Sequence, residues 1–169
     1  MTKPRIIIVD EEDRIIGFKD RGTLLSGDIY RVSALWVTDS KGNILLAQRS
    51  FSKKHSPGKW GPAVAGTNDE GETYDSNIEK EAMEELGIVD VPFERRDKIR
   101  RQGKYEYFLQ WYAAVIDLPA GAFHLQEDEV ERVEWYSPAE LRTAFEEHPD
   151  AFLSGMELYV RMFLRDQES

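Results

Sequence analysis

The sequence lacks cysteine altogether, so this chain contains neither a disulfide nor a thiol nucleophile. It also lacks any apolar run close to the ~20 residues that a membrane-spanning helix needs. The N-terminus shows no charged leader followed by a long apolar segment. We therefore expect a cytoplasmic protein with no membrane partner.

Basic residues are in deficit as well. Against 32 Asp and Glu there are 22 Lys and Arg, which gives a formal net charge of −10. A negatively charged chain does not attract the phosphate backbone of DNA or RNA. We therefore expect no nucleic-acid partner. The 169 residues, of which 41% are hydrophobic, suit one globular domain with a sizeable core.

Residues 73–87 predict a short helix. Thr73 or Asp75 can cap its first turn, because a side-chain oxygen there accepts an unpaired backbone N–H. Gly87 is typical of the left-handed residue that ends a helix. Helical periodicity separates an apolar stripe from an acidic face. The stripe is Ile78, Ala82 and Leu86, and the acidic face is Glu81, Glu84 and Glu85.

The three clustered carboxylates of this acidic face repel one another unless a cation lies between them. Oxygen ligands suit a hard divalent cation such as Mg²⁺, which keeps several waters and shares the rest with a substrate phosphate. The cluster therefore predicts a metal site. A solvated acidic face would explain the same residues, and the cluster alone does not separate the two interpretations.

The wider spacing around this helix is more specific. Five residues separate Gly66 from Glu72, and seven separate Glu72 from Lys80. With Glu81, the Glu84-Glu85 pair, Gly87 and Ile88, this stretch from 66 to 88 resembles the Nudix box of the Nudix hydrolase superfamily. One position departs, since Lys80 stands where the family has Arg. A Lys keeps the charge but loses the planar fork that holds two carboxylates at once.

The resemblance implies roles for these residues. Mg²⁺, or Mn²⁺ in its place, would be held by the Gly66 carbonyl and by three carboxylates, while two further residues orient those ligands from behind. The ligands would be Gly66, Glu81, Glu84 and Glu85, and the orienting residues Glu72 and Lys80. In many Nudix hydrolases an acid from a later loop joins the site or acts as the base. Glu129 is our first candidate for this acid and Glu127 our second.

A basic segment precedes the acidic helix. Between Lys41 and Asn68 there is no Asp or Glu, while five basic residues occur there. They are Lys41, Arg49, Lys53, Lys54 and Lys59. Such a segment suits the phosphates of a substrate whose metal ions lie on the helix. We expect Arg49 and Lys53 to bind the substrate, although a solvated loop would show the same charges.

The remaining chain predicts strands before and after the helix, then two more helices. β-branched and aromatic runs with turn signals between them indicate the strands. The predicted strands are 5–9, 14–18, 30–38, 44–48, 93–101, 105–117 and 133–136. One predicted helix begins after an N-cap at Ser137, and another spans 150–165. This order fits an α+β layered domain. By resemblance it is a single Nudix domain over 1–169, a mixed β-sheet sandwiched between α-helices (α/β/α), with an N-terminal hairpin and connector at 1–28.

A narrower resemblance concerns residues 49–60, the hairpin before them and the segment 128–135. These are similar to isopentenyl-diphosphate isomerases, which belong to the same superfamily. Those enzymes use a Cys just before the box Gly, a C-terminal Trp and several His ligands. Here the corresponding positions carry other residues, namely Ala65, Gly155, Thr67, Thr23 and Tyr30. The chain lacks the groups that isomerise an alkene and keeps the box acids.

We therefore expect a metal-dependent hydrolase of a nucleoside diphosphate derivative or another organic diphosphate, in which water attacks phosphorus. The metal would neutralise the developing charge and lower the pKa of the attacking water. Glu84 or Glu129 would take the proton, and Glu85 completes the catalytic set. Two alternatives are an isomerase-like enzyme and a module that binds a diphosphate without cleaving it. The partner would be this small molecule, and the protein would act as a monomer or a homodimer.

Overall fold

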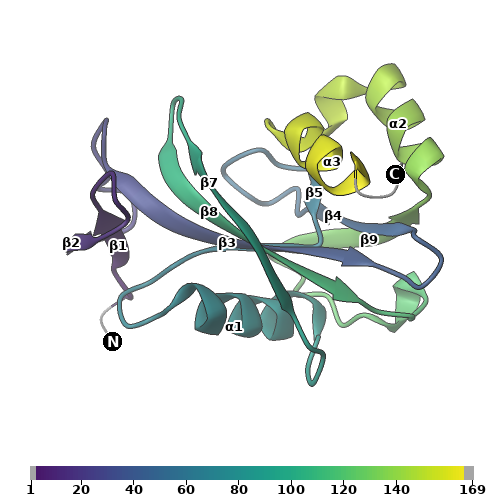
Figure 1. The fold of residues 1–169 in the computed structure, drawn as a ribbon, viewed down its shortest axis with the longest axis horizontal. Coiled ribbons are helices and arrows are strands. Elements are labelled where there is room, and N and C mark those ends of the chain that lie inside the picture. Colours follow the sequence, from purple (N-terminus) through teal and green to yellow (C-terminus); the bar gives the residue numbers. More distant parts are fainter. Residues whose placement is uncertain (1–2, 166–169) are drawn as a thin grey trace.

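The computed structural model describes residues 3–165, in which a nine-stranded mixed sheet lies between helices (Figure 1). Helix α1 covers one face of the sheet, and α2 and α3 lie over the other. The strands are β1 (Ile6–Val9), β2 (Ile15–Lys19), β3 (Ile29–Thr38), β4 (Ile44–Arg49), β5 (Trp60–Pro62), β6 (Val64–Thr67), β7 (Glu94–Arg101), β8 (Glu106–Val115) and β9 (Val130–Tyr136). The helices are α1 (Tyr74–Leu86), α2 (Pro138–Glu147) and α3 (Met156–Leu164), with short 3₁₀ turns at Ala120–Ala122 and Pro149–Ala151.

Two hydrophobic cores lie on opposite faces of this sheet. Successive side chains of a strand point to opposite faces, so one strand can supply both cores. Leu35 and Val37 of β3 belong to the core under α1, whereas Ala34 and Trp36 belong to the core under α2 and α3. The predicted α+β fold, a mixed sheet between helices, is therefore confirmed.

Strand β3 organises the sheet because both of its edges are paired. Strand β8 runs parallel to it over its whole length. The other edge pairs in turn with β1, with β6 and, only at Val37 and Thr38, with β4. Strand β4 therefore leaves β3 and continues between β5 and β9. The candidate site lies where these strands diverge.

Helix α1 begins and ends as its sequence predicts. Thr73 accepts a hydrogen bond from the backbone N–H of Ser76, and the Ser76 hydroxyl accepts one from the backbone of Thr73. Gly87 ends the helix with φ 69°, a left-handed conformation that glycine adopts without a steric penalty. Asp75, the other capping candidate, instead accepts a hydrogen bond from the Tyr112 hydroxyl. The stripe Ile78, Ala82 and Leu86 is buried against the sheet, as predicted.

The last helix was predicted wrongly at its start. It begins at Met156 rather than at residue 150, so Phe152 precedes it. The residues before it are held extended, because the backbone N–H of Leu153 donates to the Trp60 carbonyl at 2.8 Å. Phe152 also forms an isolated parallel β-bridge with Trp60. Gly155, with φ 94°, then turns the chain into α3. A helical pattern in the sequence does not reveal this pairing with β5.

Two short strands were also missed. β5 and β6 contain Gly and Pro, which carry little strand propensity, and they form because β4 and β3 offer paired edges. Strand β9 begins at Val130, three residues before the predicted start, since it continues its pairing along β4 to Arg49. The predicted N-terminal hairpin is present as β1 and β2. Within residues 3–165, none of the helices combines the length and apolarity needed to cross a bilayer.

Candidate active site

A cavity of about 860 Å³ lies at the divergence of the strands. Its walls come from β4, the following basic loop, β5, β6, α1 and the loop before β9. It contains almost every residue proposed from the sequence as a ligand, base or substrate contact. These lining residues are Arg49, Lys53, Gly66, Lys80, Glu81, Glu84, Glu85 and Glu129. Glu127 is exposed and is not part of the lining, so the structure places Glu129 rather than Glu127 in the cavity.

Glu85 is a buried acid of this cavity, with only 9% of its surface exposed. Burial is the main cause that raises the pKa of Glu85 to about 9, and the charges of Glu81 and Glu129 raise it further. Burial likewise raises the pKa of Glu81. Lys53 opposes the effect on Glu85 without cancelling it. At Glu85, burial and the neighbouring acids therefore outweigh the attraction of Lys53.

Gly66 brings strand β6 unusually close to α1. A Cβ atom at this position would lie 2.5 Å from Cγ and 2.7 Å from Cδ of Glu81. Any other residue would push the Glu81 side chain away from the strand. The glycine therefore lets the Gly66 backbone and the Glu81 carboxylate occupy the same corner of the site.

Lys80 and Asn77 hold Glu72 behind the acidic face. Nζ of Lys80 lies 2.7 Å from Oε1 of Glu72 and 3.6 Å from Oε1 of Glu81. Asn77, which is fully buried, donates from Nδ2 to the other Glu72 oxygen at 2.8 Å and to the Thr67 carbonyl at 3.2 Å. Lys80 thus links two carboxylates as a point charge, and Asn77 supplies the second hydrogen bond to Glu72 that a lysine cannot make.

Sequence reasoning missed Asn77, although a signal was present. Asn77, Glu81 and Glu85 are spaced i, i+4 and i+8, so they share one face of α1. An amide on the face that carries the acids indicates a partner for them rather than a solvated residue. Asp69, also missed, lies 3.9 Å from Nζ of Lys80 and lines the cavity, but it follows β6 in a loop whose direction the sequence does not indicate.

The basic segment closes the cavity opposite α1. Nζ of Lys53 pairs with Oε2 of Glu129 at 2.5 Å, and Nε of Arg49 donates to the carbonyl of His55 at 3.0 Å. Lys54 also lines the cavity, whereas Lys59 donates to the carbonyl of Asp150. The structure therefore places Arg49 and Lys53 in the same cavity as the carboxylates, and it pairs Lys53 with the candidate base Glu129.

The donor set fits a hard divalent cation. Glu81, Glu84 and Glu85 offer only oxygen, and Lys53 offsets only part of the cost of burying the Glu85 carboxylate. Within residues 3–165, no three acidic or imidazole groups already converge tightly on one point. Mg²⁺ does not require such a cage, because it keeps several waters among its ligands. The residues thus suit Mg²⁺ in the chemistry of their oxygen donors.

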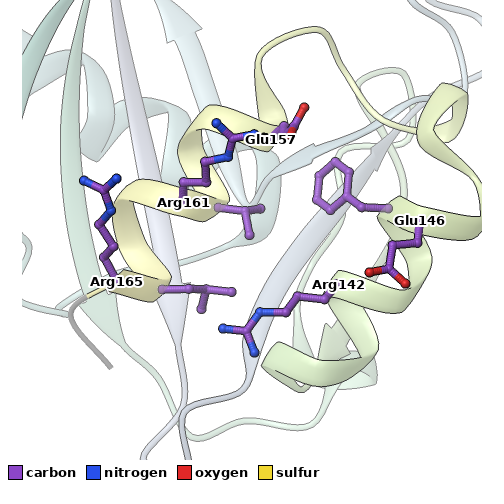
Figure 2. Close-up of a pocket in the computed structure, with 8 residues that line it drawn as sticks. Arg142, Glu146, Glu157, Arg161 and Arg165 are labelled. Carbon is purple, nitrogen blue, oxygen red and sulfur yellow. Dashed lines mark hydrogen bonds and ion pairs between the residues drawn. The ribbon is translucent and has the colours of Figure 1, made fainter. Parts of the chain in front are cut away.

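A second cavity, of about 390 Å³, lies between α2 and α3 and has a different character. Figure 2 shows that Arg142 and Glu146 of α2 and Glu157 and Arg161 of α3 surround it. Arg161 pairs with Glu157 one helical turn away. Three arginines and two glutamates line it and no residue of the box does, so it lacks the carboxylate cluster of the first cavity.

Comparison with known proteins identifies the family of this chain. The family model of the NUDIX domain matches residues 29–155. The chain is 30% identical over 154 residues to an uncharacterized Nudix hydrolase of Yersinia pestis, covering 90% of this chain and 84% of that protein. It is 33% identical over 151 residues to a prenyl-diphosphate phosphatase of Methanosarcina mazei, covering 88% of each. An isopentenyl-diphosphate Delta-isomerase of Salmonella heidelberg is 30% identical over 90 residues, only 52% of this chain and 50% of that protein.

The fold agrees with a solved structure as well. The structure of DR0079 from Deinococcus radiodurans has a TM-score of 0.82 at 23% identity and covers 94% of this chain and 98% of that one. The family model spans most of the chain and includes the whole box. The predicted relationship, including the weaker likeness to the isomerases, is confirmed, and the chain belongs to the Nudix family as a Nudix hydrolase.

Proposed function

We propose that this protein is a magnesium-dependent hydrolase of organic diphosphates, in which water attacks a phosphorus atom. The observation that carries the proposal is the buried Glu85 carboxylate, which lies in one cavity with Glu81 and opposite the basic residues Arg49 and Lys53. Excess negative charge at one wall fits a divalent cation. Positive charge at the other wall fits phosphate oxygens.

The chain's own residues have distinct tasks in this reaction. Bound Mg²⁺ or Mn²⁺, held by the Gly66 carbonyl with Glu81, Glu84 and Glu85, would neutralise charge on the phosphates and acidify the attacking water. Arg49 and Lys53 bind phosphate oxygens. Glu72 and Lys80 keep Glu81 oriented.

Glu129 or Glu84 takes the proton from the attacking water. Glu129 is paired with Lys53 in this structure. A substrate phosphate competes for the Lys53 ammonium, and this competition frees the Glu129 carboxylate to act as a base. Substrate binding and base activation are thereby coupled through one lysine.

The substrate is either a nucleoside diphosphate derivative or another organic diphosphate. The Methanosarcina mazei relative is named for prenyl diphosphates, which supports the second class. The likeness to the isomerase suggests shared diphosphate binding through Arg49 and Lys53. It does not suggest shared isomerisation, because Ala65 stands where the isomerases have their catalytic Cys. The complete set of box acids favours hydrolysis over a module that only binds a diphosphate.

Phosphate release from a panel of nucleoside and organic diphosphates tests the proposal. Each compound is incubated with the protein in Mg²⁺, in Mn²⁺ and in excess chelator. We expect turnover of at least one diphosphate with either metal and none with chelator. Turnover that persists in chelator would contradict the metal requirement. Binding without turnover of any member would favour the binding module.

A further inference from the structure

The main cavity has a second, apolar end that the proposed chemistry does not use. Four partly exposed or exposed residues with aliphatic side chains line it. They are Val32, Pro62, Ala65 and Leu153. Partly exposed aliphatic groups in a concave site are typical of contacts with a ligand.

Strand geometry separates this apolar end from the carboxylates. Gly66 faces Glu81 on α1, as its close approach shows. Its neighbour Ala65 must therefore face the opposite side of the sheet. The register agrees, because Ala65 lies across from Ala34, which belongs to the core under α2 and α3. The cavity thus reaches both faces, with charges on one and aliphatic groups on the other.

Leu153 forms the outer wall of the apolar end. It reaches the cavity because its segment pairs with Trp60 of β5 instead of joining α3. Gly61 makes room for it, since a Cβ atom there would lie 2.5 Å from Cδ1 of Leu153. The leucine is only partly buried, so its side chain can still lose water-accessible area when a ligand binds.

The lining offers little to a nucleobase. Among the described residues that line this cavity, none is Phe, Tyr or Trp, and the single aromatic ring is the small imidazole of His55, which lies edge-on against Tyr105. Proteins commonly hold an unpaired base by stacking it on such a ring, whereas aliphatic walls suit a hydrocarbon. The nearby Phe51 lies against Gly58 in the basic loop and is not part of the lining.

We propose that the aliphatic end of the cavity, with Leu153 as its outer wall and Ala65 as its floor, selects diphosphates of a hydrocarbon alcohol over nucleoside diphosphates. This inference rests on the proposed hydrolysis of organic diphosphates. The diphosphate lies between Arg49, Lys53 and the acids of α1. The hydrocarbon extends past Ala65 towards Leu153.

A series of n-alkyl diphosphates from methyl to octyl, with ADP and CDP beside them, tests the selection. Each added methylene that enters the apolar end should raise kcat/KM about fourfold, until the end is filled. ADP and CDP should be poorer substrates than the octyl compound. Calorimetric binding of the same compounds in calcium, which reports affinity without relying on turnover, should show the same order.

Leu153→Asn and Ala65→Leu locate the effect. Leu153→Asn should lower the octyl-to-methyl ratio of kcat/KM about tenfold, because a polar amide replaces an apolar contact. Ala65→Leu, at an exposed position that tolerates bulk, should stop the rise at a shorter chain. Leu158→Asn is the matched control, since Leu158 is an exposed leucine of α3 outside the cavity and should leave the ratio unchanged. Melting temperatures verify that each variant is folded.

The outcomes separate the two proposals. Turnover of ADP or CDP above the octyl compound, with no dependence on chain length, would overturn the selection and leave the hydrolase standing. The assignment of the apolar end would be overturned if Leu153→Asn and Leu158→Asn had the same octyl-to-methyl ratio of kcat/KM. It would also be overturned if this ratio were the same in Ala65→Leu as in the unmodified protein. If affinity increased with chain length but no compound were turned over, the proposed hydrolysis would be overturned and the proposed binding of hydrocarbon at the apolar end would be supported.

Discussion

At the scale of single residues, the site depends on charges that are costly without their partners. Glu85 is buried beside Glu81, and Lys53 only partly offsets the two acids. Lys80 and Asn77 each hold one oxygen of Glu72, so two neutral or cationic groups replace the single arginine of the family pattern. Each of these residues has a separate task, and substitutions can therefore separate catalysis, affinity and stability.

Replacing the Glu85 carboxylate should abolish most turnover without unfolding the protein. Glu85→Gln keeps the shape and removes a ligand charge, so kcat should fall by about 100-fold or more. Phosphate release at saturating Mg²⁺ measures it. Glu79→Gln, an exposed acid of the same helix, is the control and should retain activity. A Glu85→Gln protein with unchanged turnover would mean that this residue is no ligand.

The raised pKa of Glu85 also predicts how stability depends on pH when chelator removes any metal. Between its ordinary pKa of 4.5 and the folded value of about 9, the folded state keeps a proton that the unfolded chain has released. The contribution to stability is therefore fully present below about pH 4.5 and is lost as the pH rises through about 9. We would measure the free energy of unfolding in urea. In this window the value for Glu85→Gln should rise, relative to that of the unmodified protein, by up to about 1.4 kcal/mol per pH unit. A constant difference from pH 5 to pH 9 would show that Glu85 ionises normally.

The basic residues should act on substrate affinity. Arg49→Ala and Lys53→Ala should each weaken diphosphate binding by about 1–3 kcal/mol, because charge-assisted hydrogen bonds are lost. Lys41→Ala lies in the exposed turn after β3 and should change the dissociation constant little. Titration calorimetry with the best substrate in calcium distinguishes these cases. Equal losses in all three variants would indicate general electrostatics instead of a site.

At the scale of elements, the site depends on how closely β6 approaches α1. Gly66 permits the contact, and the capping box at Thr73 with the left-handed Gly87 fixes where the helix begins and ends. The basic loop and the strand that follows it close the other side. Asp13, in the turn of the N-terminal hairpin, ties this hairpin to Arg31, Lys98 and the Tyr74 hydroxyl at the start of α1. The hairpin therefore supports the helix from behind.

Gly66→Ala should damage the metal site while the fold survives. The added methyl group would meet Glu81 at 2.5 Å, so the carboxylate must move away from the strand. We expect the Mg²⁺ concentration for half-maximal activity to rise by about tenfold, the scale reported for disturbed ligand positioning. Gly17→Ala in β2, where a Cβ meets nothing within 4 Å, is the control. An unaltered Mg²⁺ dependence would show that the approach of β6 to α1 is not needed.

At the scale of the whole molecule, the fold is shared with proteins of different reactions, and the side chains in the cavity decide which reaction can occur. The likeness to an isopentenyl-diphosphate isomerase covers about half of this chain, and the likeness to a prenyl-diphosphate phosphatase covers most of it. Isomerisation needs a proton delivered to an unactivated alkene and a carbocation stabilised away from water. No thiol exists in this chain, Ala65 cannot donate a proton, and Gly155 offers no ring.

We therefore expect no interconversion of isopentenyl and dimethylallyl diphosphate. The diphosphate groups can still bind through Arg49 and Lys53, so isopentenyl diphosphate should compete with other substrates or be hydrolysed. Proton NMR of this compound with the protein and Mg²⁺ in deuterated water measures both processes. Dimethylallyl signals that depend on the protein would show that another acid has replaced the missing thiol.

The sequence by itself determined the layered fold, the helix from Thr73 to Gly87 and the acids that point from it, because caps, periodicity and the spacing of the box are local properties. It also indicated Arg49 and Lys53 through a gap in the acidic residues. Only the tertiary structure decided that Glu129 rather than Glu127 enters the cavity, that Lys53 pairs with it and that Asn77 holds Glu72. The pairing of residues 152–153 with β5, which brings Leu153 to the site, also required the structure. These contacts join segments far apart in the chain, and their geometry depends on strand pairing and packing that no local pattern encodes.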